Sequence, residues 1–529
     1  AAERMKAGGM DGIEIAAYGH LIDQFWSPLT NMLDGPYGAS SLQTRMQFGL
    51  DIIDAVRDRV GDDFVVGIRY TADEAEKGGI TPEIGLEMAR VLKATGKIDF
   101  FNVIRGRVHS DPALTKVIPL QGMASAPHLD FAGSVRAATG LPTFHAARIP
   151  DVATARHAIS SGHLDMVGMT RAHMADPHIV QKVMEGREDD IRPCVGATYC
   201  LDRIYQGGEA LCIHNAATGR ELTMPHVISP ADARKSIVVV GAGPGGLEAA
   251  RVCAERGHEV TVFEAADQPG GQIRLTTQTP RKREMIGIID WRMAQCAARN
   301  VRFHFNTYAD AADVTAITPD IAIIATGGLP NLELFETRGE ADHVVSTWDI
   351  LSGEAKPAGR VLIYDESGDN PGLQAAEMVA DAGCEVEVMT PDRSIAPDVM
   401  GMNLTPYLRN LQTRHVRLTV AERLLGVTRE GNQLAATIGT DYSDFIRKQY
   451  YDQVVVNYGT RPLADLYFDL RDGSSNKGQF DYDALIAGAP QTLNTNPQGT
   501  YKLFRIGDAV SSRNTHAAIY DALRLCHIL

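Results

Sequence analysis

The chain has 529 residues, which is enough for roughly three to four domains of about 150 residues each. Its 44% hydrophobic and 22% charged content is ordinary for a globular protein, and its net charge of −15 excludes a basic surface for nucleic acid or anionic membranes. No apolar run approaches the roughly 20 residues that span a bilayer. The seven cysteines are odd in number and do not form a disulfide framework, so we expect a cytoplasmic protein.

Residues 1–190 alternate short apolar runs with amphipathic helical patterns, which is typical of β/α units around a parallel sheet. The expected strands are 12–15, 64–70, 99–104, 141–146 and 165–169, with helices such as 43–60 and 82–95 between them. Five such units follow the rhythm of a (β/α)8 barrel without closing one. Because the chain opens in mid-helix without a Met, we expect an α/β fold whose first three barrel strands lie upstream.

Polar residues follow the carboxyl ends of these strands, where (β/α)8 barrels carry their chemistry. A backbone of small residues at Gly168, with the guanidinium of Arg171 beside it, is suited to hold a phosphate. The candidates are, in chain order, Tyr18, His20, Arg69, Arg105, Arg107, Gly168 and Arg171.

Residues 191–234 hold three of the seven cysteines, Cys194, Cys200 and Cys212, and are expected to form a metal-binding junction. Thiolates this close in sequence indicate iron or zinc more readily than disulfides. Both metals usually take four protein ligands, but Ala197 stands where a C-x-x-C-x-x-C run would place the middle cysteine. His214 is the nearest candidate for the fourth ligand, so the sequence does not decide between iron and zinc.

Residues 235–358 and 464–529 are expected to form a dinucleotide-binding domain. The run KSIVVVGAGPGG leads from a strand through a glycine turn into a helix, and an acidic residue closes the next strand about 20 residues later, as a ribose acceptor should. The predicted nucleotide-binding residues are Gly241, Gly243, Gly246, Glu264, Gly271, Gly507 and Asp508.

Residues 359–463 are expected to form a second, inserted α/β domain of the same type, whose glycine turn is interrupted by larger residues. Asp365, Ser367 and Asp369 stand where small residues would be needed. Acidic side chains at a helix N-terminus repel a pyrophosphate, so we expect a retained fold without a nicotinamide site.

Several of these segments together resemble the old yellow enzyme family, in the larger branch that includes trimethylamine dehydrogenase and 2,4-dienoyl-CoA reductase. They are DGIEIAAYGHLIDQFWSPLTN, VVGIRY, HAARIPD, DMVGMTRAHMADP and DDIRPCVG. The resemblance implies FMN in the barrel, a [4Fe–4S] cluster just after it, and FAD or ADP in the dinucleotide domain. By matching position, Arg69 would face the flavin, and Gly168 and Arg171 would hold the FMN phosphate.

The departures from that family are also informative. The segment AAYGH is one residue shorter than the usual H-G-A-H-x-Y, which places Tyr18 near the second His and His20 near the Tyr. Arg107 stands where trimethylamine dehydrogenase has an acidic residue. With RPCVGATYCLDRIYQGGEALCIHNAATGRE, these features look like the bacterial demethylases of dimethylglycine and N-methylproline.

That resemblance implies an FMN-dependent oxidative N-demethylase of a small N-methylated amino acid. Tyr18 and His20 would position the amine and handle protons, and Arg105 and Arg107 would bind the substrate carboxylate. Electrons would pass to a protein acceptor such as an electron-transfer flavoprotein or a partner subunit, within an oligomer or hetero-complex.

Two other functions stay open. One is an NADPH-dependent enoate reductase like 2,4-dienoyl-CoA reductase, and the other is an electron-transfer or scaffold subunit of a larger complex. The family resemblance favours an iron–sulfur cluster at the cysteines, whereas the lost fourth ligand favours zinc.

Overall fold

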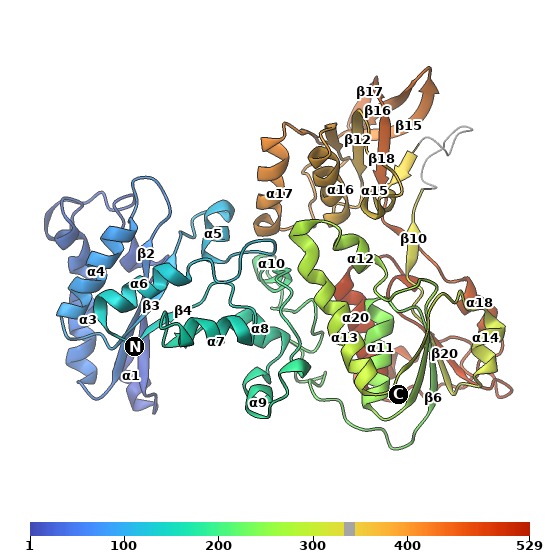
Figure 1. Cartoon of the computed structure of the whole chain (residues 1–529), viewed down its shortest axis with the longest axis horizontal. Helices are drawn as coiled ribbons and strands as arrows, with labels where there is room; N and C mark the ends of the chain where they lie inside the picture. Colours follow the sequence, from blue (N-terminus) through green and yellow to red (C-terminus); the bar gives the residue numbers. More distant parts are fainter. Residues whose placement is uncertain (333–343) are drawn as a thin grey trace. The chain divides into compact units, whose positions relative to one another are not determined.

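The structure is a computed structural model that describes residues 1–332 and 344–529. It divides into two compact units, Ala1–His173 and Met174–Leu529 (Figure 1). Within the described residues, no helix has the length and apolar character needed to cross a membrane.

The first unit is built on a sheet of five parallel strands in the order β1-β2-β3-β4-β5, so the expected β/α succession is confirmed. The strands are β1 (Gly12–Ala17), β2 (Val65–Asp73), β3 (Phe100–Arg105), β4 (Thr143–His145) and β5 (Met166–Val167). The helices are α1 (Ala2–Ala7), α2 (Leu21–Trp26), α3 (Leu42–Val60), α4 (Pro82–Ala94), α5 (Asp111–Val117), α6 (Leu129–Thr139), α7 (Val152–Ser160) and α8 (Thr170–Ala175).

The pleat of this sheet separates its core residues from its site residues. Ile15, Ile68 and Phe101 are buried in the core beneath the helices. Because successive side chains of a strand point to opposite faces, Arg69 projects from the other face. The strands are parallel, so all their carboxyl ends lie along one edge of the sheet, where Tyr18 follows β1.

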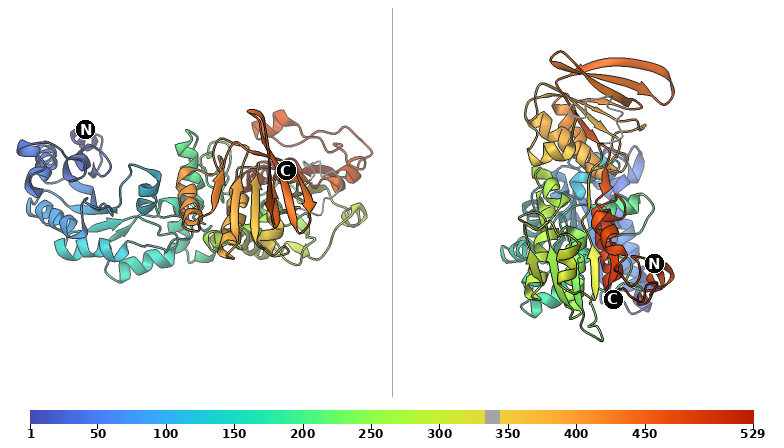
Figure 2. Two further views of the ribbon diagram at one scale, coloured as in Figure 1. Left: turned by 90° about the horizontal axis from the view of Figure 1, so that it is seen from above. Right: turned by 90° about the vertical axis from the view of Figure 1, so that its right-hand side faces the viewer.

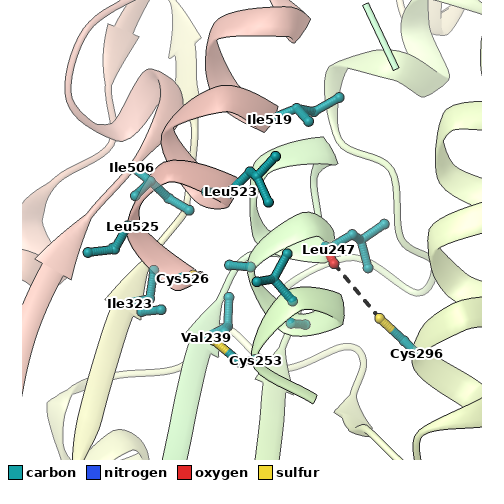
Figure 3. Close-up of a cluster of buried hydrophobic side chains, with 14 of the residues drawn as sticks. Val239, Leu247, Cys253, Cys296, Ile323, Ile506, Ile519, Leu523, Leu525 and Cys526 are labelled. Carbon is teal, nitrogen blue, oxygen red and sulfur yellow. Dashed lines mark hydrogen bonds between the residues drawn. The ribbon is translucent and has the colours of Figure 1, made fainter. Parts of the chain in front are cut away.

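The second unit holds the dinucleotide-type sheet, with parallel strands in the order β20-β9-β6-β7-β8. The strands are β6 (Ser236–Val240), β7 (Glu259–Phe263), β8 (Arg302–His304), β9 (Ile321–Ile324) and β20 (Lys502–Arg505). Helices α11 (Pro244–Glu255), α13 (Gly287–Ala298) and α20 (Thr515–Cys526) cover one face, and α14 (Ala311–Ala316) and α18 (Asp465–Arg471) cover the other (Figure 1). Figure 3 shows the first of these cores, in which Leu247 and Cys253 of α11 share one buried cluster with Val239 of β6 and Leu523 of α20.

The second unit also contains the inserted domain, whose parallel sheet has the order β11-β18-β12-β13-β14 (Figure 2). Its strands are β11 (Val344–Ser346), β12 (Arg360–Asp365), β13 (Glu385–Met389), β14 (Arg417–Thr419) and β18 (Gln453–Asn457). The antiparallel strands β15 (Arg423–Glu430), β16 (Gln433–Thr440) and β17 (Ser443–Tyr451) form a separate sheet, and the helices are α15 (Thr347–Ser352), α16 (Asn370–Asp381) and α17 (Gly401–Thr413). Because β11 pairs with β18, the insertion takes in residues that the sequence assigned to the dinucleotide domain before position 359.

The antiparallel pair β10 (Gly328–Pro330) and β19 (Thr460–Pro462) holds together the outgoing and returning chain of the insertion. The remaining helical elements of the second unit are α9 (Ile179–Met184), η2 (Glu188–Asp190), α10 (Tyr199–Tyr205), α12 (Gln272–Thr276), η3 (Pro280–Ile286), α19 (Tyr482–Ala487) and η5 (Gly507–Ala509). The cysteine segment 191–234 thus belongs to this unit.

Candidate functional site

The Tyr18 ring, which follows β1, meets the Arg69 guanidinium, which projects from the middle of β2. Ala16 pairs with Arg69 across the two strands, which places Tyr18 just beyond that pair. The guanidinium carbon of Arg69 lies 4.9 Å from the centre of the half-buried Tyr18 ring, a cation–π distance. The Nε of Arg69 is buried and has no hydrogen-bond partner among the described residues, so this edge of the sheet offers an unused donor to a ligand.

The structure gives carboxylate partners to the two arginines that follow β3. The Nε of Arg105 lies 2.7 Å from Asp73, and its side chain is 37% exposed. Arg107 lies 3.2 Å from Glu74 and 3.3 Å from Glu76, and its side chain is only 14% exposed. Arg105 therefore keeps access to a substrate carboxylate, whereas Arg107 is already neutralised within the protein.

His20 lies exposed at the N-cap position of α2, two residues after Tyr18. The residue between them, Gly19, has a positive φ of 65°, so the chain turns sharply here. The structure thus places both predicted catalytic side chains on one turn, with only Tyr18 stacked on Arg69.

The loops after β4 and β5 carry the predicted phosphate seat. A Cβ at Gly168 would lie 2.6 Å from the Cβ of Ala146, so only glycine allows these strand ends to approach so closely. The Nη2 of Arg171 donates to the carbonyl of Pro119 at 3.0 Å. This arrangement keeps the end of β5 free of side-chain bulk and holds one guanidinium beside it.

Sequence reasoning missed Arg148, a second cation in the same region. Arg148 is 6% exposed, has a positive φ of 52°, and donates from Nε to the carbonyl of Met123 at 2.8 Å. Arg148 and Arg171 therefore both bind the loop of residues 119–123. The available signal in the sequence was Arg148 itself, which follows two alanines and lies three residues beyond His145, the last residue of β4.

In the dinucleotide domain, two of the three predicted turn glycines are required by packing. A Cβ at Gly241 would lie 2.3 Å from the carbonyl oxygen of Ala325, and a Cβ at Gly246 would lie 1.9 Å from that of Gly241. Gly243 differs, because nothing lies within 4 Å of the Cβ position. Gly243 caps the N-terminus of α11, so the open space lies where backbone N–H groups attract an anion.

The other predicted nucleotide residues gather around this turn. Glu264 accepts hydrogen bonds from the backbone N–H of Ala242 at 2.7 Å and from that of Ala266 at 2.9 Å. A Cβ at Gly271 would lie 3.5 Å from the Cα of Gly243, so the two glycine segments are in contact. The expected glycine and acid elements of a dinucleotide site are therefore brought together.

Asp508 joins the same cluster from the carboxyl end of β20. Its carboxylate accepts hydrogen bonds from Gln272 at 3.1 Å and from the backbone N–H of Arg513 at 3.1 Å. Burial raises the pKa of Asp508, while these bonds oppose the rise. Gly507, with a φ of 62°, makes the turn that presents Asp508, so two segments far apart in sequence converge here.

The equivalent turn of the inserted domain is occupied by its own carboxylate. Asp365 is 2% exposed and accepts hydrogen bonds from Asn457 at 2.8 Å and from the N–H groups of Ser367 and Gly368 at 3.2 Å. A Cβ at Gly372 would lie 2.6 Å from the Asp365 carboxyl, which leaves no room beside the start of α16. N–H groups of the kind that would cradle a phosphate are thus bound to Asp365 instead.

The sulfur of Cys212 lies in a polar setting within the cysteine segment. Burial raises the pKa of Cys212, while hydrogen bonds from the backbone of His214 and Asn215 oppose the rise, and Cys194 is close enough to add to it. The Nδ1 of His516 lies 2.9 Å from the carbonyl of Cys212, which ties the segment to α20.

The backbone of His214 contacts the Cys212 sulfur, and the Nε2 of its ring has no hydrogen-bond partner among the described residues. Its ring is fully buried, its Nδ1 lies 3.0 Å from the carbonyl of Pro193, and it packs edge-on against Trp291 at 5.4 Å. Burial and the neighbouring Arg292 and Arg192 hold its pKa well below the ordinary value, so the ring is neutral. Across residues 1–332 and 344–529, no three His, Cys, Asp or Glu side chains are placed to hold a metal ion. The predicted ligand set Cys194, Cys200, Cys212 and His214 is therefore not assembled in this structure.

Comparison with known proteins places the chain in a family. Residues 1–190 match the NADH:flavin oxidoreductase / NADH oxidase family, and residues 235–522 match the pyridine nucleotide-disulphide oxidoreductase family. A probable N-methylproline demethylase of Rhizobium meliloti (strain 1021) is 64% identical over 525 residues, covering 99% of this chain and 77% of the relative. The chain belongs to the same family as this relative, with an NADH:flavin oxidoreductase / NADH oxidase region followed by a pyridine nucleotide-disulphide oxidoreductase region.

Two further comparisons agree with this assignment. An N,N-dimethylglycine/sarcosine dehydrogenase of Chromohalobacter salexigens is 45% identical over 537 residues, covering 99% of this chain and 77% of the relative. The structure of a 2-naphthoyl-CoA reductase in complex with 2-naphthoyl-CoA is similar at a TM-score of 0.85 and 28% identity, covering 99% of this chain and 74% of that chain. The predicted family resemblance and the combination of a β/α barrel with nucleotide-binding domains are confirmed.

Members of the NADH:flavin oxidoreductase / NADH oxidase family are flavin-dependent oxidoreductases, and the residues present fit such a cofactor. The unused Nε of Arg69 suits the polar edge of a flavin, where a cation stabilises the reduced, anionic ring. The open space at Gly243 likewise suits the FAD- or NAD-type nucleotide that the second family implies. The metal at Cys194, Cys200 and Cys212 remains a prediction.

Proposed function

We propose that this chain is an FMN-dependent oxidative N-demethylase of a small N-methylated amino acid. The substrate would lose hydride from its N-methyl carbon, and the resulting iminium would hydrolyse to formaldehyde and the demethylated amine. The observation that carries the proposal is the 64% identity with the N-methylproline demethylase along 99% of this chain. The dehydrogenase of dimethylglycine and sarcosine, at 45% identity, supports the same class of substrate.

Residues of the barrel would bind the FMN cofactor. Arg69, Gly168 and Arg171 would hold FMN, with Arg148 as an added cation near the phosphate. When bound, FMN supplies a two-electron hydride acceptor.

The side chains of the rim would handle the substrate. Tyr18, stacked on Arg69, positions the amine beside the cofactor. His20 exchanges protons with solvent, because its ring is exposed. Arg105 binds the substrate carboxylate, since guanidinium pairs bidentately with carboxylates.

The remaining cofactors and partners are part of the same proposal. An adenine nucleotide, FAD or ADP, would bind at Gly241, Gly243, Gly246, Glu264, Gly271, Gly507 and Asp508. Cys194, Cys200 and Cys212 would bind an iron–sulfur cluster or zinc, and His214 is the candidate fourth ligand, because its ring is neutral and its Nε2 has no hydrogen-bond partner among the described residues. We infer a protein electron acceptor, an oligomeric or hetero-complex state, and a cytoplasmic location.

The second candidate function is reduction of an acyl-CoA alkene by NADPH, which the likeness to 2-naphthoyl-CoA reductase favours. Asp365 argues against it, because the carboxylate occupies the turn where a nicotinamide dinucleotide would place its phosphates.

Anaerobic mixing of the full-length protein with N-methylproline, dimethylglycine or NADPH separates the two functions. We expect one of the amines to bleach the flavin absorbance and release formaldehyde, and NADPH to leave the flavin oxidised. Rapid bleaching by NADPH without bleaching by either amine would establish the reductase instead.

A further inference from the structure

The turn that carries Tyr18 and His20 has a shape that only the surrounding structure explains. Gly19, between them, has a φ of 65°, and a Cβ on it would lie 2.7 Å from a methyl group of Val108. Val108 follows β3, so the ends of β1 and β3 are in contact at this glycine. The direction of both predicted catalytic side chains therefore depends on how this one turn is held.

Asp23 supplies the hydrogen bond that holds the turn. It lies in α2, is 5% exposed, and accepts the backbone N–H of Gly19 at 3.1 Å. The side chain of Thr71, two residues beyond Arg69, lies near this carboxylate and lowers its pKa. Asp23 thus accepts a hydrogen bond from the Tyr18 turn and lies near β2, the strand from which Arg69 projects.

A buried acid–base pair, Glu74 and Arg107, lies near Asp23. Glu74 is 1% exposed and accepts hydrogen bonds from the Ser27 hydroxyl at 2.9 Å and from the backbone N–H of Ile80 at 2.6 Å. Arg107 pairs with Glu74, and both act electrostatically on Asp23. The segments after β1, β2 and β3 are therefore tied together by one polar network, which gives Arg107 its role.

Burial of Asp23 destabilises its charged form. Removal from water raises its pKa, and the nearby Glu74 adds to the rise. A carboxylate in the first turn of a helix can also act as a cap, worth about 0.3–1 kcal/mol. An exposed carboxylate would stabilise the helix N-terminus equally well. Helix capping therefore does not explain why Asp23 is buried and bonded to Gly19.

We propose that Asp23 is a positioning residue, which fixes the Tyr18–Gly19–His20 turn so that both side chains meet the substrate amine. This inference rests on the proposed function for the identity of the substrate. Its structural part, the restraint of Gly19 by Asp23, stands apart from the substrate and can be measured separately.

The test compares Asp23→Ala with Asp23→Asn in the full-length flavin-loaded protein, with the exposed Asp62→Ala as the control. Turnover of N-methylproline or dimethylglycine gives kcat and KM, and hydrogen exchange of the peptide containing Gly19 reports the restraint without substrate. We expect Asp23→Ala to lower kcat/KM by about tenfold or more with unchanged flavin content, because misplacement by about 1 Å has effects of that order. Exchange at Gly19 should accelerate in the same variant.

Asp23→Asn is expected to keep kcat/KM within about threefold of wild type and to keep Gly19 protected, since its amide oxygen still accepts the N–H. If Asp23→Ala leaves both exchange and kcat/KM unchanged, or if Asp23→Asn loses as much as Asp23→Ala, the inference is wrong. If Asp23→Ala does not fold, Gly19→Ala takes its place and must lower kcat/KM by a similar factor. If wild type oxidises neither amine, the proposed function fails, and the exchange result alone decides the role of Asp23.

Discussion

The buried carboxyl of Asp365 should make the stability of the inserted domain depend on pH. Burial raises its pKa from 3.8 to about 7, although hydrogen bonds from Asn457, Gly368 and Ser367 oppose the rise. In the unfolded chain the group loses its proton near the ordinary value, whereas in the folded protein it keeps the proton until about pH 7. The folded state therefore binds more protons between these values, and stability is lost as pH rises through that window.

The size of the effect follows from the two pKa values. A difference of about 3 pH units corresponds to roughly 4 kcal/mol at about 1.4 kcal/mol per unit. Asp365→Asn removes the titration and keeps an oxygen that can accept the same N–H groups. We expect the free energy of unfolding of this variant to rise relative to wild type by roughly 3 kcal/mol between about pH 5 and about pH 8.

Urea unfolding of both proteins at the two pH values measures this difference, since other titrating groups cancel between them. A difference that stays constant with pH would refute the reasoning and would mean that Asp365 is ionised in the folded domain. In that case the carboxylate would be held by its hydrogen bonds more strongly than burial opposes it.

Three further changes test other parts of the site. Gly243→Ala should lose adenine nucleotide on purification but keep the thermal stability of nucleotide-free wild type, because its Cβ meets nothing within 4 Å. Gly246→Ala should lower stability by about 1–3 kcal/mol through overpacking. Equal nucleotide content in Gly243→Ala and wild type would contradict the site. Arg105→Gln should raise KM for the amino acid about tenfold. Arg107→Gln should chiefly lower stability. A raised KM in Arg107→Gln with an unchanged KM in Arg105→Gln would show that Arg107 binds the substrate. Cys194→Ala should reduce the content of iron or zinc measured on the purified protein, and an unchanged content would remove the cysteines as ligands.

The strands and glycine turns could be predicted from sequence because their signals are local. The apolar run before Gly241 and the acidic residue Glu264 each lie within one βαβ unit, where spacing along the chain fixes spacing in space. The alternation of apolar runs and helical patterns in the first 190 residues likewise predicts each strand from its own local sequence. These features did not require knowledge of contacts between distant segments.

The missed features depend on such contacts. Arg107 was expected to bind substrate, but its partners Glu74 and Glu76 come from another loop and can be identified only after folding. Asp23 reads in sequence as an ordinary helical surface residue, and only the structure shows it buried. Residues 344–346 fall within the range expected for the dinucleotide domain, yet β11 pairs with β18 of the inserted sheet, because a three-residue run does not indicate its partner.

The central claim is that this chain oxidises an N-methylated amino acid through its barrel flavin. The most direct measurement is stopped-flow absorbance of the flavin after anaerobic mixing of the full-length protein with N-methylproline or dimethylglycine, with formaldehyde assayed in the same samples. We expect one of these amines to bleach the flavin, with one formaldehyde released for each flavin reduced, and NADPH to leave the flavin oxidised. Bleaching by NADPH alone, with neither amine producing formaldehyde, would contradict it.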